Sequence, residues 1–119
     1  LGNGIDKHTN EPYSELFCMD ISKNGDISNP LLFSRILNTK HNEGQIAFSP
    51  EETVAYYTRS QRDNSKNYQL YIAYLEPYSH GNWKGHKQLT LNTNYSIEHP
   101  HVSPDGSKLY FASNRVIIL

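Results

Sequence analysis

The sequence predicts an all-β fold built from repeated antiparallel sheets, and three observations support this prediction. Pro104-Asp105-Gly106 is a strong turn signal, and the apolar and aromatic run at 108–113 that follows it suits a half-buried strand. The same pattern occurs 54 positions earlier, where Pro50 takes the place of Pro104 and Tyr56 that of Tyr110. No segment carries apolar residues at the i, i+3, i+4 spacing of an amphipathic helix over three turns.

The expected elements follow the chain in order. Residues 1–12 carry two glycines and a proline between polar residues, which is typical of a loop or of the tail of a preceding sheet. Asn24-Gly25 is a hairpin turn signal, and Asn29-Pro30 interrupts the next strand, as a sheet edge allows. The predicted strands are 16–21, one within 27–37, 45–48, 53–60, 68–75, 83–89, 98–103 and 108–114. Residues 61–67 are expected to form a polar loop, and residues 77–81 a longer turn.

A further match fixes the length of the repeat. Residues 15–20 and residues 69–74 are related by the same offset of 54 positions. Repeats of roughly 20–50 residues indicate solenoids, propellers or arrays, and this period lies just above that range. We therefore predict antiparallel four-stranded blades of an incomplete β-propeller, with about two blades' worth of strands. The second half of a blade is expected at 12–40, a complete blade at 41–93, and the first half of the next blade at 94–115.

The repeat resembles a known family at this point. Ser103-Pro104-Asp105-Gly106, followed by residues 109–115, resembles the WD40-like repeat named after its Pro-Asp dipeptide, which is found in TolB-type β-propellers. Residues 70–73 and Gly81-Asn82-Trp83 are similar to the propeller domain of OmpA-family cell-envelope proteins of Bacteroidota, including the PorE type. The resemblance covers residues 15–115. The first copy departs from the pattern, because Glu51-Glu52 replaces Asp-Gly and its turn must close without a glycine.

The resemblance implies a function and a location. It implies a non-catalytic protein-interaction or scaffold module of a bacterial outer-membrane or periplasmic protein, associated with type 9 secretion and gliding in the PorE-type members. The implied partners are proteins of the cell envelope and the remaining blades of the parent propeller, and no cofactor is implied. Two alternatives stay open: the gating propeller of a prolyl-oligopeptidase-type serine peptidase, and a TolB-like periplasmic translocation protein. Gly81-Asn82-Trp83 favours the envelope family over the peptidase propeller.

Composition excludes several classes of protein. The net charge of −1 offers no basic excess to hold a phosphate backbone, so nucleic acid is not expected as a partner. No apolar run approaches the ~20 residues that a membrane span needs. The single cysteine, Cys18, excludes an internal disulfide, and its position in a predicted strand indicates a buried packing thiol. The apolar tail 116–119 is expected to need a surface to pack on.

The candidate site residues fall into two groups. The first group forms the repeat turns and is interpreted as scaffold: Ser49, Pro50, Ser103, Pro104, Asp105 and Gly106. The second group offers aromatic side chains to a partner, because aromatic residues anchor interfaces, and consists of Trp83 and Tyr78. For Trp83 we prefer the interpretation that it packs between blades.

No catalytic, cofactor or metal site is predicted. His99 and His101 share a face of their strand, but no spacing forces His80 or His86 to join them, and zinc needs three or four converging ligands. Residues 63–67 alternate oxygen-bearing side chains as a calcium loop does, but they lack its central glycine and closing glutamate. Glu43 and Glu98, near the starts of their strands, are interpreted as recurring scaffold contacts.

Overall fold

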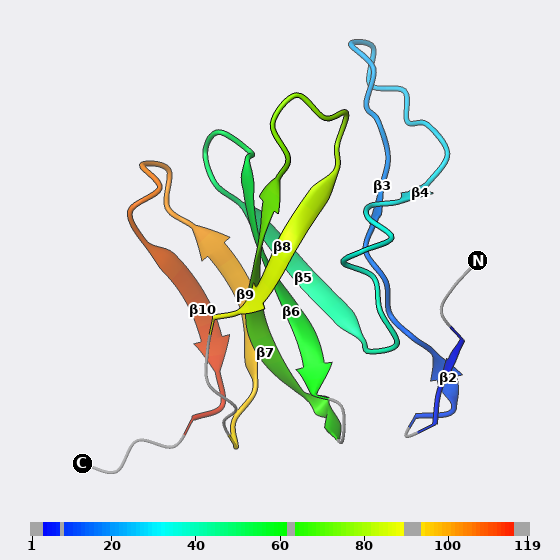
Figure 1. The fold of residues 1–119 in the computed structure, drawn as a ribbon, viewed down its shortest axis with the longest axis vertical. Helices are drawn as coiled ribbons and strands as arrows, with labels where there is room; N and C mark the ends of the chain where they lie inside the picture. Colours follow the sequence, from blue (N-terminus) through cyan, green and yellow to red (C-terminus); the bar gives the residue numbers. More distant parts are fainter. Residues whose placement is uncertain (1–3, 8, 62–63, 90–93, 116–119) are drawn as a thin grey trace.

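The computed structural model describes residues 4–7, 9–61, 64–89 and 94–115, and every sheet in these residues is antiparallel (Figure 1). Ten strands and no helix occur in the part of the chain that the structure describes. The predicted all-β antiparallel class is therefore confirmed, whereas the arrangement of the sheets as propeller blades remains a prediction.

A four-stranded sheet forms the centre of the molecule. Its strands are β5 (Glu43–Phe48), β6 (Val54–Gln61), β7 (Asn64–Leu75) and β8 (Trp83–Gln88), paired in the order β5-β6-β7-β8. These strands agree with the predicted ones, except that β6 and β7 continue into the expected polar loop and pair up to Gln61 opposite Asn64. The prediction of a long loop at 61–67 is thus wrong, because the hairpin ladder continues through most of it.

The chain before this sheet contains shorter strands than predicted. The pair β1 (Ile5–Asp6) and β2 (Glu11–Pro12) forms a small hairpin where a loop or the tail of a preceding sheet was expected. The pair β3 (Phe17–Cys18) and β4 (Leu31–Leu32) replaces the longer strands expected at 16–21 and 27–37.

The side chain of Asn38 binds both backbone groups of Leu16, which lies next to β3. The side chain of Asn38 accepts a hydrogen bond from the Leu16 N–H at 2.7 Å and donates one to the Leu16 carbonyl at 3.1 Å. The predicted turn at Asn24-Gly25 is confirmed, with Gly25 at φ 87° and a bridge between Ile21 and Ile27.

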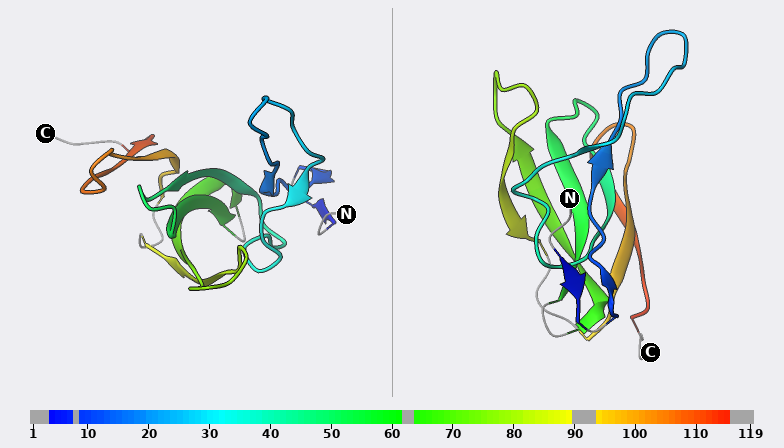
Figure 2. Two further views of the ribbon diagram at one scale, coloured as in Figure 1. Left: turned by 90° about the horizontal axis from the view of Figure 1, so that it is seen from above. Right: turned by 90° about the vertical axis from the view of Figure 1, so that its right-hand side faces the viewer.

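The last described hairpin joins β9 (Ile97–Val102) and β10 (Leu109–Ser113). β9 lies against β5, β6 and β7, on one face of the central sheet. The segment that carries β3 and β4 lies on the opposite side of the central sheet, so three layers succeed one another in the view from above (Figure 2). No helix among the described residues is long and apolar enough to cross a membrane.

The core is divided between the two faces of the central sheet. The segment that carries β3 and β4 is here called the first layer. Its residues Leu16 and Leu37 form one buried cluster with four residues of the central sheet: Ala55, Tyr57, Ala73 and Trp83. On the other face, Leu70, Ile72 and Ile97 are buried between the central sheet and β9. The central sheet is therefore the only one whose two faces are both covered within the described residues.

Candidate functional site

The first repeat turn is closed by Ser49. The Ser49 N–H donates to the Val54 carbonyl at 2.9 Å, and the Val54 N–H donates back to the Ser49 hydroxyl oxygen at 3.1 Å. The Glu52 N–H donates to the Ser49 carbonyl at 2.8 Å, with Glu52 in the left-handed region at φ 60°. The turn thus closes without a glycine, as the sequence required, because a glutamate adopts the conformation that glycine usually supplies.

The second turn repeats these contacts 54 residues later. The Ser103 N–H donates to the Lys108 carbonyl at 2.9 Å, and the Lys108 N–H donates to the Ser103 hydroxyl oxygen at 3.0 Å. The Gly106 N–H donates to the Ser103 carbonyl at 2.9 Å, with Gly106 at φ 76°. Ser49 and Ser103, which follow β5 and β9, therefore perform the same structural role.

Asp105 completes the second turn electrostatically. One oxygen of its carboxylate accepts hydrogen bonds from the Ser103 hydroxyl at 2.7 Å, the Ser107 N–H at 3.0 Å and the Ser107 hydroxyl at 2.8 Å. These bonds, the Ser103 hydroxyl first, lower the pKa of Asp105 to about 2, because they favour the charged carboxylate. The carboxylate thus stabilises its own turn.

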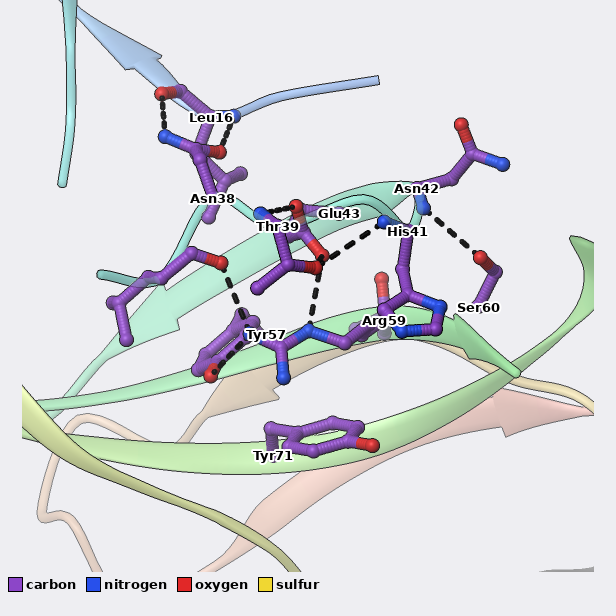
Figure 3. A network of polar contacts seen from close by, with 12 residues as sticks. Leu16, Asn38, Thr39, His41, Asn42, Glu43, Tyr57, Arg59, Ser60 and Tyr71 are labelled. Atoms are coloured by element: carbon purple, nitrogen blue, oxygen red, sulfur yellow. Dashed lines mark hydrogen bonds and ion pairs between the residues drawn. The ribbon is translucent and has the colours of Figure 1, made fainter. Parts of the chain in front are cut away.

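A buried ion pair lies between the first layer and the central sheet (Figure 3). Glu43 at the start of β5 pairs in register with Arg59 on β6, and the Arg59 Nε donates to the Glu43 carboxylate at 2.9 Å. Thr39 satisfies the same carboxylate with its backbone N–H at 2.7 Å and its hydroxyl at 2.8 Å. Burial raises the pKa of Glu43, and the bonds from Thr39 and the charge of Arg59 oppose that shift.

Aromatic rings enclose the cation of this pair. The guanidinium carbon of Arg59 lies 4.6 Å from the centre of the Tyr71 ring and 5.5 Å from that of Tyr57, within the range of cation–π attraction. The two tyrosine rings are stacked with centroids 5.7 Å apart. Burial raises the pKa of Tyr57 to about 12. Arg59 also donates to the Leu37 carbonyl at 3.0 Å, so this network, here called the Glu43–Arg59 brace, joins two layers.

The sequence interpretation of Glu43 and Glu98 as recurring residues is wrong. Glu43 lies opposite Arg59, and the residue 54 positions after it is Ile97, which lies opposite Ser113 in the same register. Glu98 lies one position further along β9. The polar brace of the first unit is therefore replaced by a buried isoleucine in the second, and the two carboxylates do not share a site.

A groove lies where the first layer meets the turn between β7 and β8. It has a volume of about 420 Å³, and its lining includes the aromatic residues Phe33 and Trp83. The Trp83 ring is only 6% exposed, because it packs on the rings of Phe33 at 5.5 Å and Phe48 at 5.7 Å. Trp83 thus packs between layers, whereas Tyr78, on the turn beside the groove, is fully exposed with φ 59°.

Charged groups surround the groove. Arg35, Glu76 and Lys84 contribute to its lining, and the Lys84 ammonium lies 3.1 Å from the Glu76 carboxylate in an exposed ion pair. The exposed side chain of Ile36 adds apolar surface.

Several further candidates are placed by the structure. His80, His99 and His101 are exposed, and the described residues contain no group of three metal-ligating side chains. Cys18 is exposed, so its prediction as a buried thiol is wrong: β3 is short and its outer side carries no cover within the described residues. The side chain of His86, part of the segment 63–67 and the tail 116–119 fall outside the residues that the structure describes.

Sequence reasoning missed the residues that clamp the layers together. Asn38 holds both backbone groups of Leu16, and Thr39 holds Glu43. A signal was present in the sequence, since Leu37-Asn38-Thr39 recurs as Leu91-Asn92-Thr93 at the same 54-residue offset. The second triplet lies in the part of the chain that is not described.

Comparison with known proteins adds no assignment: no protein-family model, no curated protein and no solved structure matches the chain.

Proposed function

We propose that the chain is about two blades' worth of a β-propeller of the TolB type, and that it serves as a non-catalytic protein-interaction scaffold in a bacterial cell envelope. The observation that carries the proposal is the repetition of hydrogen bonds between successive layers at 54 residues. The Ser14 N–H donates to the Asn42 side chain at 2.9 Å, and the Tyr68 N–H donates to the Ser96 side chain at 3.0 Å.

A second pair of bonds repeats at the same 54-residue offset, within a sheet instead of between sheets. The Asn42 N–H donates to the Ser60 side chain at 2.9 Å, and the Ser96 N–H donates to the Asn114 side chain at 2.8 Å. The first pair attaches each layer to the next, and the second pair closes the hairpin within a layer. Both pairs use equivalent positions, although the side chains themselves differ. Such stacking of equivalent units is what a radial repeat requires, since each unit covers a face of its neighbour.

The assignment of a non-catalytic role follows from how the polar groups are used. Both carboxylate oxygens of Glu43 accept hydrogen bonds from the protein itself, and one oxygen of Asp105 accepts three from its own turn. A carboxylate in that state is not available as a base or nucleophile. The location in the outer membrane or periplasm, and the link to OmpA-family and PorE-type proteins, rest on the resemblance of residues 15–115.

The proposed binding face is the groove beside the β7–β8 turn, with Tyr78 as its exposed anchor. Tyr78 lies on the turn whose residues Gly81 and Asn82 line the groove, and exposed tyrosines contribute strongly to protein interfaces. Arg35 adds a cation at the same face. The proposed ligand is therefore a polypeptide of the cell envelope that contacts the turn and the groove together.

The test is affinity capture from bacterial envelope extracts with the chain as bait, followed by identification and reconstitution of the recovered protein. Tyr78→Ala and replacement of residues 77–82 by Gly/Ser are expected to lower recovery at least tenfold. Tyr74→Ala is the matched control, since Tyr74 is also exposed but lies within β7. Equal recovery by all variants would remove the groove as the binding face.

A further inference from the structure

Two half-sheets lie at the outer layers of the molecule, and they are complementary to each other. We propose that β10 of one copy of this chain pairs edge to edge with β3 of a second copy, so that the two half-sheets complete a four-stranded sheet in the order β9-β10-β3-β4. The proposed partner is thus a second copy of the same chain. This inference rests on the 54-residue repeat and goes beyond the proposed role of the groove.

The two half-sheets match the two halves of the central sheet. Leu109 pairs with Val102 as Ala55 pairs with Phe48, so β9 and β10 correspond to β5 and β6. On the other side, the Phe33 N–H donates to the Leu16 carbonyl at 2.9 Å, as the Leu89 N–H donates to the Leu70 carbonyl at 2.8 Å. Leu16 and Leu70 are 54 residues apart, whereas Phe33 and Leu89 are 56 apart, so β3 corresponds to β7 at the repeat offset and β4 corresponds to β8 with a shift of two residues.

Each half-sheet leaves one edge without a strand partner in the described part of the chain. β3 is paired only with β4, and β10 only with β9. Unpaired edges offer a row of backbone donors and acceptors to another strand. β3 and β10 lie on opposite sides of the central sheet, so they cannot pair within one molecule (Figure 2).

The register of the new contact follows from β6 and β7. Tyr57 lies opposite Tyr71 there, and the same offset places Phe111 opposite Phe17 of the second copy. Ala55 lies opposite Ala73, which likewise places Leu109 opposite Met19. Phe111 is 49% exposed, Phe17 55% and Met19 50%, so the contact covers apolar surface that is otherwise open to water.

Charge supports the same register. Val54 lies opposite Tyr74 in the central sheet, and the offset places Lys108 opposite Asp20 of the second copy. Both side chains are exposed in the single chain. Opposite charges directly across an antiparallel pair stabilise it, whereas a slip by one residue would separate them and turn the side chains to the other face.

The contact is head-to-tail, which determines the assemblies that it forms. A heterologous contact generates a closed ring or an open filament. Each copy contributes the equivalent of two sheets, since its two half-sheets add to one.

The test uses the native cysteine as a probe. Tyr56 lies opposite Ile72, so residue 110 is expected to lie opposite Cys18 of the second copy. Residues opposite each other in an antiparallel pair have Cα atoms about 4.5 to 5.5 Å apart, within the range that a disulfide bridges. Tyr110→Cys is therefore expected to form intermolecular disulfides with Cys18 under mild oxidation, at least tenfold faster than Tyr78→Cys. Tyr78→Cys is the matched control for an exposed cysteine outside the edge.

Charge reversal provides a second readout that does not depend on oxidation. In sedimentation experiments the chain is expected to form closed oligomers. Lys108→Glu is expected to weaken association at least tenfold, and the double variant Lys108→Glu/Asp20→Lys is expected to restore it. A monomer at all concentrations, or equal crosslinking of Tyr110→Cys and Tyr78→Cys, would overturn the proposal, because it would show that the two edges do not pair between copies. Neither outcome affects capture of a partner at the groove, so the two proposals fail separately.

Discussion

Gly106 of the second repeat turn lies against Pro50 of the first. A β-carbon at position 106 would lie 3.2 Å from the Cδ atom of Pro50 and 3.3 Å from its Cγ atom. The two turns that the sequence marks as equivalent are therefore in direct contact, and each belongs to a different layer. This contact fixes the ends of the central sheet and of the β9–β10 hairpin relative to each other.

Gly106→Ala is expected to lower the free energy of unfolding by more than the left-handed backbone alone explains. That conformation costs about 1 kcal/mol for a residue with a β-carbon, and the contact with Pro50 adds to it. Gly25→Ala is the matched control, because Gly25 also has a positive φ but no atom within 4 Å of its β-carbon position. Urea unfolding of both variants measures the difference, and equal losses would show that the turns do not touch.

Glu52→Gly is expected to stabilise the protein by about 1 kcal/mol, because it relieves a non-glycine residue at φ 60°. Glu51→Gly, at the neighbouring position of the same turn, is expected to be neutral or destabilising, since it only adds freedom to the unfolded chain. Thermal melting of the two variants compares them directly. Stabilisation by Glu51→Gly but not by Glu52→Gly would place the left-handed residue elsewhere.

Arg59→Met is expected to destabilise the protein by about 3 to 5 kcal/mol, since it leaves the carboxylate of Glu43 buried without its cation. The double variant Glu43→Gln/Arg59→Met removes both charges and is expected to recover a large part of that loss. Urea unfolding of the single and double variants forms the test. Additive losses would show that the two charges do not interact.

Stability at high pH is expected to depend on Tyr57. Its pKa is raised to about 12 in the folded protein from 10.0, so the folded state favours the neutral phenol. The contribution is fully present below pH 10 and is lost as the pH rises through about 12. Melting temperatures between pH 9 and pH 12 are expected to fall more steeply for the wild-type chain than for Tyr57→Phe. Parallel curves would contradict the buried position of the hydroxyl.

Trp83→Ala is expected to cost about 3 to 5 kcal/mol of stability, because it empties the contact between Phe33 and Phe48. Tyr78→Ala is expected to leave stability unchanged, since the ring contributes no buried surface. Calorimetry of the two variants separates the packing residue from the proposed partner contact. A stability loss in Tyr78→Ala as large as that in Trp83→Ala would show that Tyr78 is also a packing residue.

Local signals made the hairpins predictable, and long-range contacts limited the rest. The turns at Asn24-Gly25 and Pro104-Asp105-Gly106 depend on neighbouring residues only, so the sequence contains what determines them. The end of the β3–β4 pair is held by the Asn38 side chain, which bonds both backbone groups of Leu16 from 22 residues away. No local pattern carries that information.

The buried charge pair was missed for a similar reason. An irregularity between Glu43 and Ile46 shifts the register of β5 against β6. The sequence does not reveal such a bulge, so the pairing of Glu43 with Arg59 was not predicted. The match of Glu43 with Glu98 had a different cause, since these two residues are 55 positions apart and not 54. The exposure of Cys18 depends on which layer covers β3, which is likewise a property of the assembled layers.

The central claim is that the layers are successive members of one 54-residue repeat, and an experimental structure of this chain tests it most directly. The measurement is the rotation and translation that superimpose residues 14–18 on 68–72, compared with those that superimpose residues 43–60 on 97–114. The account predicts that one and the same transformation serves both pairs. Two different transformations, or a helix in either segment, would contradict it.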